Sequence, residues 1–309
     1  MIVSSIFSVG QQVLILFILI SVGFVCAKTK LLQSGAIPGI NNLLLYTVTP
    51  CVIIESFHRE YQPDMLLSLG YAALAAAAAH LINIAAASLL VRDKDKSREA
   101  VLRFGTVFSN CGYMALPLQD ALLGPEGVFY GATFIAVFNI FNWTYGIFLM
   151  GGKEAGFSAR KLVLNPGILS VSAGLFFFLT PFSLPQILFT PVRSLAALNT
   201  PLPMVIIGYY LSCLPSLRVV FDGKLWLTVF LRLIALPVAQ TFLFYFLGLR
   251  DALLVSAVVS ACAPPAANAL VFASKFNRDT ELAVTLVAVA TAVSILTMPV
   301  VVAVSMTLP

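Results

Sequence analysis

Charged side chains are scarce in this sequence. Asp, Glu, Lys and Arg make up 10% of its 309 residues, whereas hydrophobic residues make up 60%. Soluble proteins typically contain about 25% charged residues, and a soluble domain of this length could not bury so much apolar surface. The composition therefore excludes an ordinary soluble domain and predicts a protein of the lipid bilayer. For the same reason we do not interpret the net charge of +5 as a nucleic-acid-binding surface.

Several motifs of enzymes and metal sites are also missing. None of the five cysteines forms the CxxC spacing of zinc or redox sites. The GxxxxGK(S/T) loop of ATPases and the protease motifs GxGD and HExxH are absent. We therefore expect no cofactor, no metal site and no enzymatic activity, and we interpret the cysteines as small buried hydrophobic residues.

Ten hydrophobic runs approach the length of about 20 residues that a membrane-spanning helix needs. Glycine, proline or charged residues separate consecutive runs. The sequence therefore predicts an all-α membrane protein with ten transmembrane helices, numbered here in chain order. The predicted helices cover residues 6–27, 38–57, 65–91, 100–122, 128–150, 162–180, 188–213, 222–247, 252–274 and 281–306.

Positive charge is concentrated in alternate connections between these helices. The odd-numbered connections hold 14 of the 18 Lys and Arg residues, the even-numbered ones hold three, and Arg232 lies within helix eight. Cytoplasmic loops of membrane proteins carry an excess of Lys and Arg. We therefore expect a multi-pass protein of the plasma (inner) membrane with both termini outside.

A short pattern recurs in the two halves of the chain. Residues 47–54 and 200–207 both read T-x-x-P-x-V-I-I, and Ser109-Asn110-Cys111 is matched weakly by Ser260-Ala261-Cys262. Each pair occupies the same ordinal helix in each half. Because five helices precede the second copy, it would enter the membrane inverted, as in many secondary transporters. We predict a first repeat over 1–150, a cytoplasmic linker over 151–163 and a second repeat over 164–309.

Helices four and nine contain residues that interrupt an α-helix. Pro264 and Pro265 are consecutive, and proline lacks the N–H that a regular helix requires. Interrupted segments at matching places in two halves are the best sequence indication of a transporter's binding site. The alternative is that these prolines only shape packing, and this applies most to the prolines of helices two and seven. The candidate substrate-binding residues are Asn110, Cys111, Gly112, Pro117, Pro264, Pro265, Asn268, Pro50 and Pro203.

The direction of the two broken helices predicts the sign of the substrate. They enter from opposite sides, so the half-helix after each break begins near the middle of the bilayer. Each helix N-terminus carries roughly half a positive charge and unpaired N–H donors. Asn110 and Asn268 add carboxamide donors. Such a site could bind a carboxylate without a buried Lys or Arg.

At these residues the chain resembles the auxin efflux carrier family, in its short bacterial form. The resemblance covers nearly the whole sequence and rests on Asn42 with Pro50, on residues 110–117 followed by 122–124, and on Pro264-Pro265 followed by 270–277. The last stretch is the most specific.

The resemblance implies a fold related to the bile-acid sodium symporters. In that fold, helices one, two, six and seven form a scaffold, and the other six form a moving transport domain in which helices four and nine cross at the site. It also implies a homodimer and carboxylate substrates such as malate, malonate or auxin-like acids.

Four ionisable residues fall within the predicted helices, where such residues are functional candidates. Glu55 and Asp120 could carry protons or lie at headgroup level. His80 could titrate or be simply hydrogen-bonded. Arg232 could bind an anion or pair with an acidic residue. We treat all four as candidates for proton or ion coupling.

The prediction is thus a secondary transporter that moves a small organic anion by alternating access. A sodium-coupled, bile-acid-like symporter is the nearest alternative, and sodium dependence would separate the two. A channel or receptor is the alternative from another class, and a channel would give unitary currents.

Overall fold

The computed structural model of this chain is helical. It describes residues 2–152, 160, 163–180, 182–213 and 219–308, and none of these belongs to a β-strand. The predicted linker 151–163 lies mostly outside the described residues. Seven segments are long and apolar enough to cross a membrane. The chain is therefore an all-α integral membrane protein, as its composition predicts.

The helices of the first part of the chain follow one another with short connections. They are α1 (Ile2–Lys28), η1 (Ser34–Ala36), α2 (Ile37–Leu43), η2 (Leu44–Val48), α3 (Thr49–Phe57), α4 (Pro63–Leu90), α5 (Lys96–Val107), η3 (Cys111–Ala115), α6 (Leu116–Phe141), η4 (Asn142–Gly146) and α7 (Ile147–Gly151).

The second part is built in a similar way. Its elements are α9 (Pro166–Leu179), α10 (Gln186–Ala196), η6 (Ala197–Asn199), α11 (Pro201–Ser212), η7 (Val219–Phe221), α12 (Gly223–Phe230), η8 (Leu231–Ala235), α13 (Leu236–Phe246), α14 (Asp251–Cys262), α15 (Asn268–Lys275) and α16 (Thr280–Ser305).

Three of the ten predicted spans, helices four, six and nine, do not appear as separate segments among these seven. Helix four is interrupted after Val107, and a kink at Gly124, whose φ of +62° and ψ of −154° are not helical, separates its second part from helix five within α6. Helix nine is divided by its prolines into segments of 12 and 8 residues, and α9 has 14 residues. The count of ten crossings stays a prediction, because each difference falls where a helix is broken, kinked or short.

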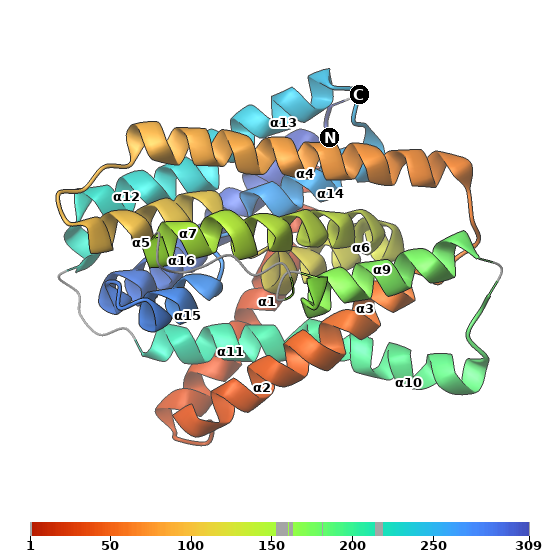
Figure 1. Cartoon of the computed structure of the whole chain (residues 1–309), viewed down its shortest axis with the longest axis horizontal. Coiled ribbons are helices and arrows are strands. Elements are labelled where there is room, and N and C mark those ends of the chain that lie inside the picture. The colour runs from red at the N-terminus through yellow and green to blue at the C-terminus, as the bar shows by residue number, and fades with distance from the viewer. Residues whose placement is uncertain (1, 153–159, 161–162, 181, 214–218, 309) are drawn as a thin grey trace.

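Helices α4 and α6 run roughly along the length of the molecule, and α1 crosses it obliquely behind them (Figure 1). In this view α2, α3, α10 and α11 lie on one side, and α4, α5, α12 and α13 lie on the other. Helices α1 and α11 approach closely at Gly23 and Gly208. A Cβ on Gly208 would collide with the backbone of Ile20 and Phe24 in α1. Small residues permit such close contact between membrane helices.

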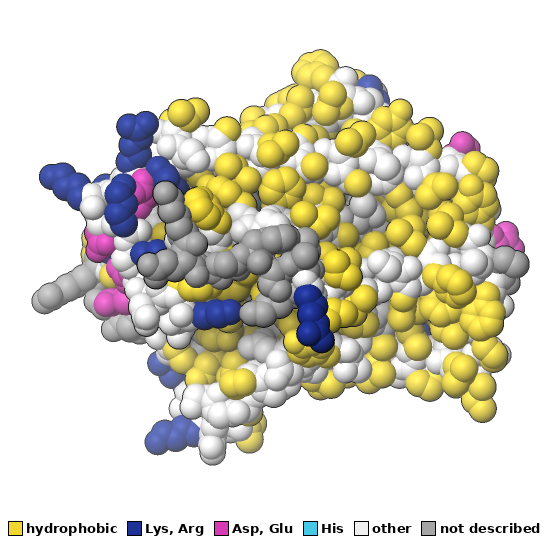
Figure 2. All heavy atoms as spheres, in the orientation of Figure 1, with side chains coloured by type: hydrophobic (Ala, Val, Ile, Leu, Met, Phe, Trp, Pro, Cys, Tyr) yellow, Lys and Arg dark blue, Asp and Glu magenta, His cyan; other side chains and the backbone are white. Residues whose placement is uncertain are grey.

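One end of the molecule carries most of the visible positive charge, and apolar side chains are prominent over much of the remaining face in Figure 2. Three helices begin at this end with an aspartate cap: Asp95 for α5, Asp222 for α12 and Asp279 for α16. Arg98 forms ion pairs with Asp222 and, at 3.2 Å, with Asp279. Capping and ion pairing therefore hold three helix starts together at the polar end.

Candidate functional site

The breaks in helices four and nine meet each other. Asn110 N donates to Pro264 O at 2.7 Å, and Ala266 N donates to Phe108 O at 2.9 Å. Ser109 and Pro265 form an isolated antiparallel bridge. These bonds satisfy backbone groups that the interrupted helices leave free, as a membrane interior requires. We call residues 108–110 and 263–267 the crossing.

A helix begins directly after each side of the crossing. Asn110 caps the first, since its Oδ1 accepts from Tyr113 N at 3.3 Å. That helix runs from Cys111 through η3 into α6, and α15 begins at Asn268 on the other side. Asn110 is buried. Asn110 Nδ2 donates no hydrogen bond to any described residue, so it is a free donor.

A cavity of about 80 Å³ lies at these two helix starts. No carboxylate, Lys or Arg belongs to its described lining, which combines amide and hydroxyl groups with apolar side chains. We call it the crossing cavity. Its lining residues are Leu45, Thr49, Ser109, Asn110, Cys111, Gly112, Tyr113, Ile135, Phe138, Asn139, Gly167, Ala266, Ala267 and Asn268.

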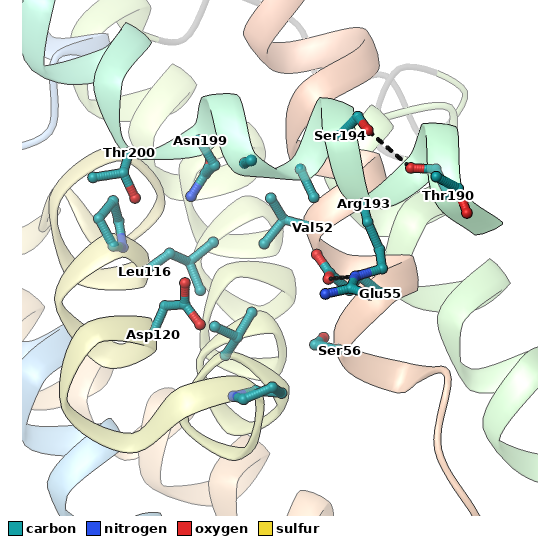
Figure 3. Close-up of a pocket in the computed structure, with 15 residues that line it drawn as sticks. Val52, Glu55, Ser56, Leu116, Asp120, Thr190, Arg193, Ser194, Asn199 and Thr200 are labelled. Atoms are coloured by element: carbon teal, nitrogen blue, oxygen red, sulfur yellow. Dashed lines mark hydrogen bonds and ion pairs between the residues drawn. The ribbon is translucent and has the colours of Figure 1, made fainter.

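A larger cavity of about 530 Å³ lies further along the same helices, which contribute Val52 from α3 and Leu116 from α6. Figure 3 shows Glu55 of α3 and Arg193 of α10 paired across it, with Asp120 of α6 nearby. Glu55 Oε1 lies 3.3 Å from Arg193 Nε. We call it the α3–α10 cavity. Its described lining holds one cation and two carboxylates.

Arg232 lies on the helix formed by α12, η8 and α13 and is 1% exposed. Its guanidinium donates to backbone carbonyl oxygens of both broken helices: to Ala263 at 3.1 Å, to Thr106 at 3.2 Å, to Val107 at 3.3 Å and to Ala261. Neither an anion nor an acidic side chain takes these donors among the described residues.

His80 is also buried and is surrounded by aromatic rings. Its Nδ1 lies 2.7 Å from Ala76 O, and Phe141 stacks on it with ring centroids 5.0 Å apart. This geometry is that of a hydrogen-bonded histidine in an apolar helix. His80 lines neither of the two cavities.

The structure brings together four of the predicted site residues in the crossing cavity: Asn110, Cys111, Gly112 and Asn268. Pro264 and Pro265 form the crossing itself, and Pro117 lines the α3–α10 cavity with Glu55 and Asp120. Pro50 and Pro203 line neither cavity and lie near the starts of α3 and α11.

Sequence reasoning missed several residues that line these cavities, and three of them are polar or charged residues close to the predicted sites. Thr49 and Asn139 line the crossing cavity, and Arg193 lines the α3–α10 cavity. Thr49 stands next to Pro50 but at a variable position of the repeated pattern, so the pattern does not single it out. Arg193 was counted as a loop charge, and no local pattern relates it to Glu55, which is 138 positions away.

The family model described as membrane transport protein matches residues 8–302, which is nearly the whole chain. The chain belongs to this family, that of the auxin efflux carriers. The protein is therefore a membrane transporter. A search of curated proteins returned no match.

Proposed function

We propose that this auxin efflux carrier family member is a secondary transporter for a small organic anion, a carboxylate such as malate, malonate or an auxin-like acid. The observation that carries the proposal is the crossing cavity, where two helix starts and the Asn110 and Asn268 amides meet. Helix N-termini and amide N–H groups favour anions. The absence of acidic groups from the described lining removes the main source of repulsion for a carboxylate.

The size of the cavity favours a small acid over a steroid. Pockets for drug-sized ligands measure about 300–1,000 Å³, whereas the crossing cavity measures about 80 Å³. This comparison argues against the bile-acid-like alternative and, among the acids named above, favours malate and malonate over a larger auxin-like acid. Saturable exchange, rather than unitary currents, would separate the carrier from a channel or receptor.

Alternating access would then expose the crossing cavity to each side in turn. Helices one, two, six and seven would serve as the scaffold, and the other six would move. The arrangement in Figure 1 supports this division, since α2, α3, α10 and α11 lie apart from α4, α5, α12 and α13. We further propose a homodimer in the plasma (inner) membrane with both termini outside, and no enzymatic activity.

The α3–α10 cavity would be the vestibule through which the anion approaches. Arg193 provides attraction for a carboxylate, and its pairing with Glu55 keeps it from holding the substrate too tightly. Glu55 and Asp120 are the candidates for proton coupling, because both face this cavity.

Counterflow in proteoliposomes tests the proposal. Vesicles are preloaded with one of a panel of small carboxylates, and uptake of the labelled acid is measured for the native protein, Asn110→Ala and Pro264→Ala/Pro265→Ala. Gln33→Ala is a matched control, because this exposed carboxamide caps no helix with its side chain. Saturable exchange that the control retains and the site variants lose supports the carrier. Failure of folded native protein to exchange any acid would refute the anion assignment.

A further inference from the structure

Arg232 is a buried cation without an acidic partner in the described part of the chain. Its guanidinium is always protonated in proteins. Burying such a charge is costly unless other groups compensate it. Here the compensation comes from four carbonyl oxygens, those of Thr106, Val107, Ala261 and Ala263.

These carbonyls come from two helix C-termini. Thr106 and Val107 are the last residues of α5, Ala261 lies at the end of α14, and Ala263 is the cap residue of α14. The last carbonyls of a helix have no partner within it. Each C-terminus carries roughly −0.5 elementary charge, so the two ends together present about −1. One guanidinium balances that charge.

The crossing thus has two electrostatic sides. The helix starts at Cys111 and Asn268 face the crossing cavity, and the helix ends at Val107 and Cys262 face Arg232. In transporters with broken helices, half-helix C-termini and unwound carbonyls coordinate the coupling Na⁺ or H⁺. Arg232 occupies that kind of position.

We infer that Arg232 is a resident cation that takes the place of a coupling sodium ion at the two helix C-termini, so that anion transport does not require Na⁺. The inference rests on the proposed function. A polar second layer supports it, since Asn83 Nδ2 also donates to Val107 O at 3.2 Å and Gln240 Nε2 donates to Asn83 Oδ1 at 2.7 Å. The side chains behind the crossing thus fix the Val107 carbonyl beside the guanidinium.

The carbonyl oxygens at this position are already occupied. Arg232 binds four of them, so a sodium ion at the two helix C-termini would have to displace the guanidinium to use them. The fixed charge also holds α5 and α14 together when the anion site is empty.

The first test uses the native protein. Counterflow of a transported carboxylate is measured with Na⁺ on both sides and again with Na⁺ replaced by N-methyl-D-glucamine. We expect equal initial rates. Flux that requires Na⁺ would overturn the inference and leave the anion carrier intact. No flux in either medium would instead refute the proposed function, so the two failures are distinguishable.

The second test removes the resident charge. Arg232→Gln should lose flux in N-methyl-D-glucamine and regain it with added guanidinium or Na⁺. It is compared, at equal folded yield, with Arg232→Lys and with the exposed control Arg92→Gln. Lysine keeps the charge but not the planar fork of donors, so its loss should be smaller. Two results with folded Arg232→Gln would overturn the inference: normal transport without an added cation, or lost transport that neither guanidinium nor Na⁺ restores. If the variant does not fold, the native sodium test decides.

Discussion

Substitution of Asn110 separates helix capping from anion binding, because the two ends of its carboxamide do different work. Oδ1 caps the helix that begins at Cys111, and loss of a cap costs about 1 kcal/mol of stability. Nδ2 is the proposed donor to the substrate in the crossing cavity. A hydrogen bond to a charged group contributes about 1.5–3 kcal/mol, which corresponds to a change of about 10- to 150-fold in affinity.

Asn110→Ala should therefore lose both contributions, with a small decrease in thermal stability and an increase of about 10- to 150-fold in the KM for the carboxylate. Asn110→Asp should retain the cap, because Asp and Asn are equally good at this position. The aspartate would place a carboxylate against the substrate, so transport should be lost. The helix N-terminus that the side chain caps offsets the cost of burying its charge, so stability should decrease less than in Asn110→Ala.

The assays are thermal unfolding in detergent and the initial rate of counterflow at several concentrations of the acid, with Gln33→Ala as control. Asn110→Asp that exchanges carboxylate with the KM of the native protein would refute the assignment of Asn110 as a substrate donor. Equal loss of stability in both variants would show that the cap had been misassigned.

Three further predictions concern packing, the polar end and coupling. Gly208→Leu should destabilise the fold by about 1–3 kcal/mol or more, because the side chain overpacks the contact between α1 and α11. Its unfolding temperature should decrease, whereas that of the exposed control Gly70→Leu should not. At the polar end, the pKa of Asp93 lies below its usual value. Partial burial raises this pKa, but three groups together lower it by more: the N–H of Asp95, the hydrogen bond and charge of Lys224, and the charge of Arg98. The ionised Asp93 therefore stabilises the folded protein at neutral pH, and this stabilisation is lost as pH falls below about 4. Asp93→Asn should make the unfolding temperature depend less on acid pH, and an unchanged acid dependence would contradict this. Glu55→Gln should retain counterflow but lose uptake driven by a pH gradient if Glu55 carries the coupled proton; unchanged gradient-driven uptake would exclude that role.

Much of the helical framework could be predicted from the sequence, because its signals are local. Hydrophobic length predicts α4 over 65–91, and the structure places it at Pro63–Leu90. Pro264 and Pro265 predict a break, and the structure has non-helical residues between Cys262 and Asn268. Proline chemistry acts on neighbouring residues, so a single sequence displays it.

The contacts of the site could not be predicted in the same detail, because they join residues far apart in the chain. Arg232 reaches Thr106 across 126 positions, and Arg193 reaches Glu55 across 138. Their spacing carries no periodic signal. By contrast, the junction predicted between residues 122 and 128 coincides with a kink at Gly124, because the signals of glycine and proline are local.

The most direct test of the proposed site is an experimental structure of the protein with a transported carboxylate bound. We expect the carboxylate in the crossing cavity, about 3 Å from Asn110 Nδ2 and from Asn268 N, because the next two N–H groups of α15, those of Ala269 and Leu270, already donate to Ala266 O and Ala267 O. A carboxylate held instead by Arg193 in the α3–α10 cavity, with the crossing cavity empty, would contradict the central claim that the two helix starts bind the anion.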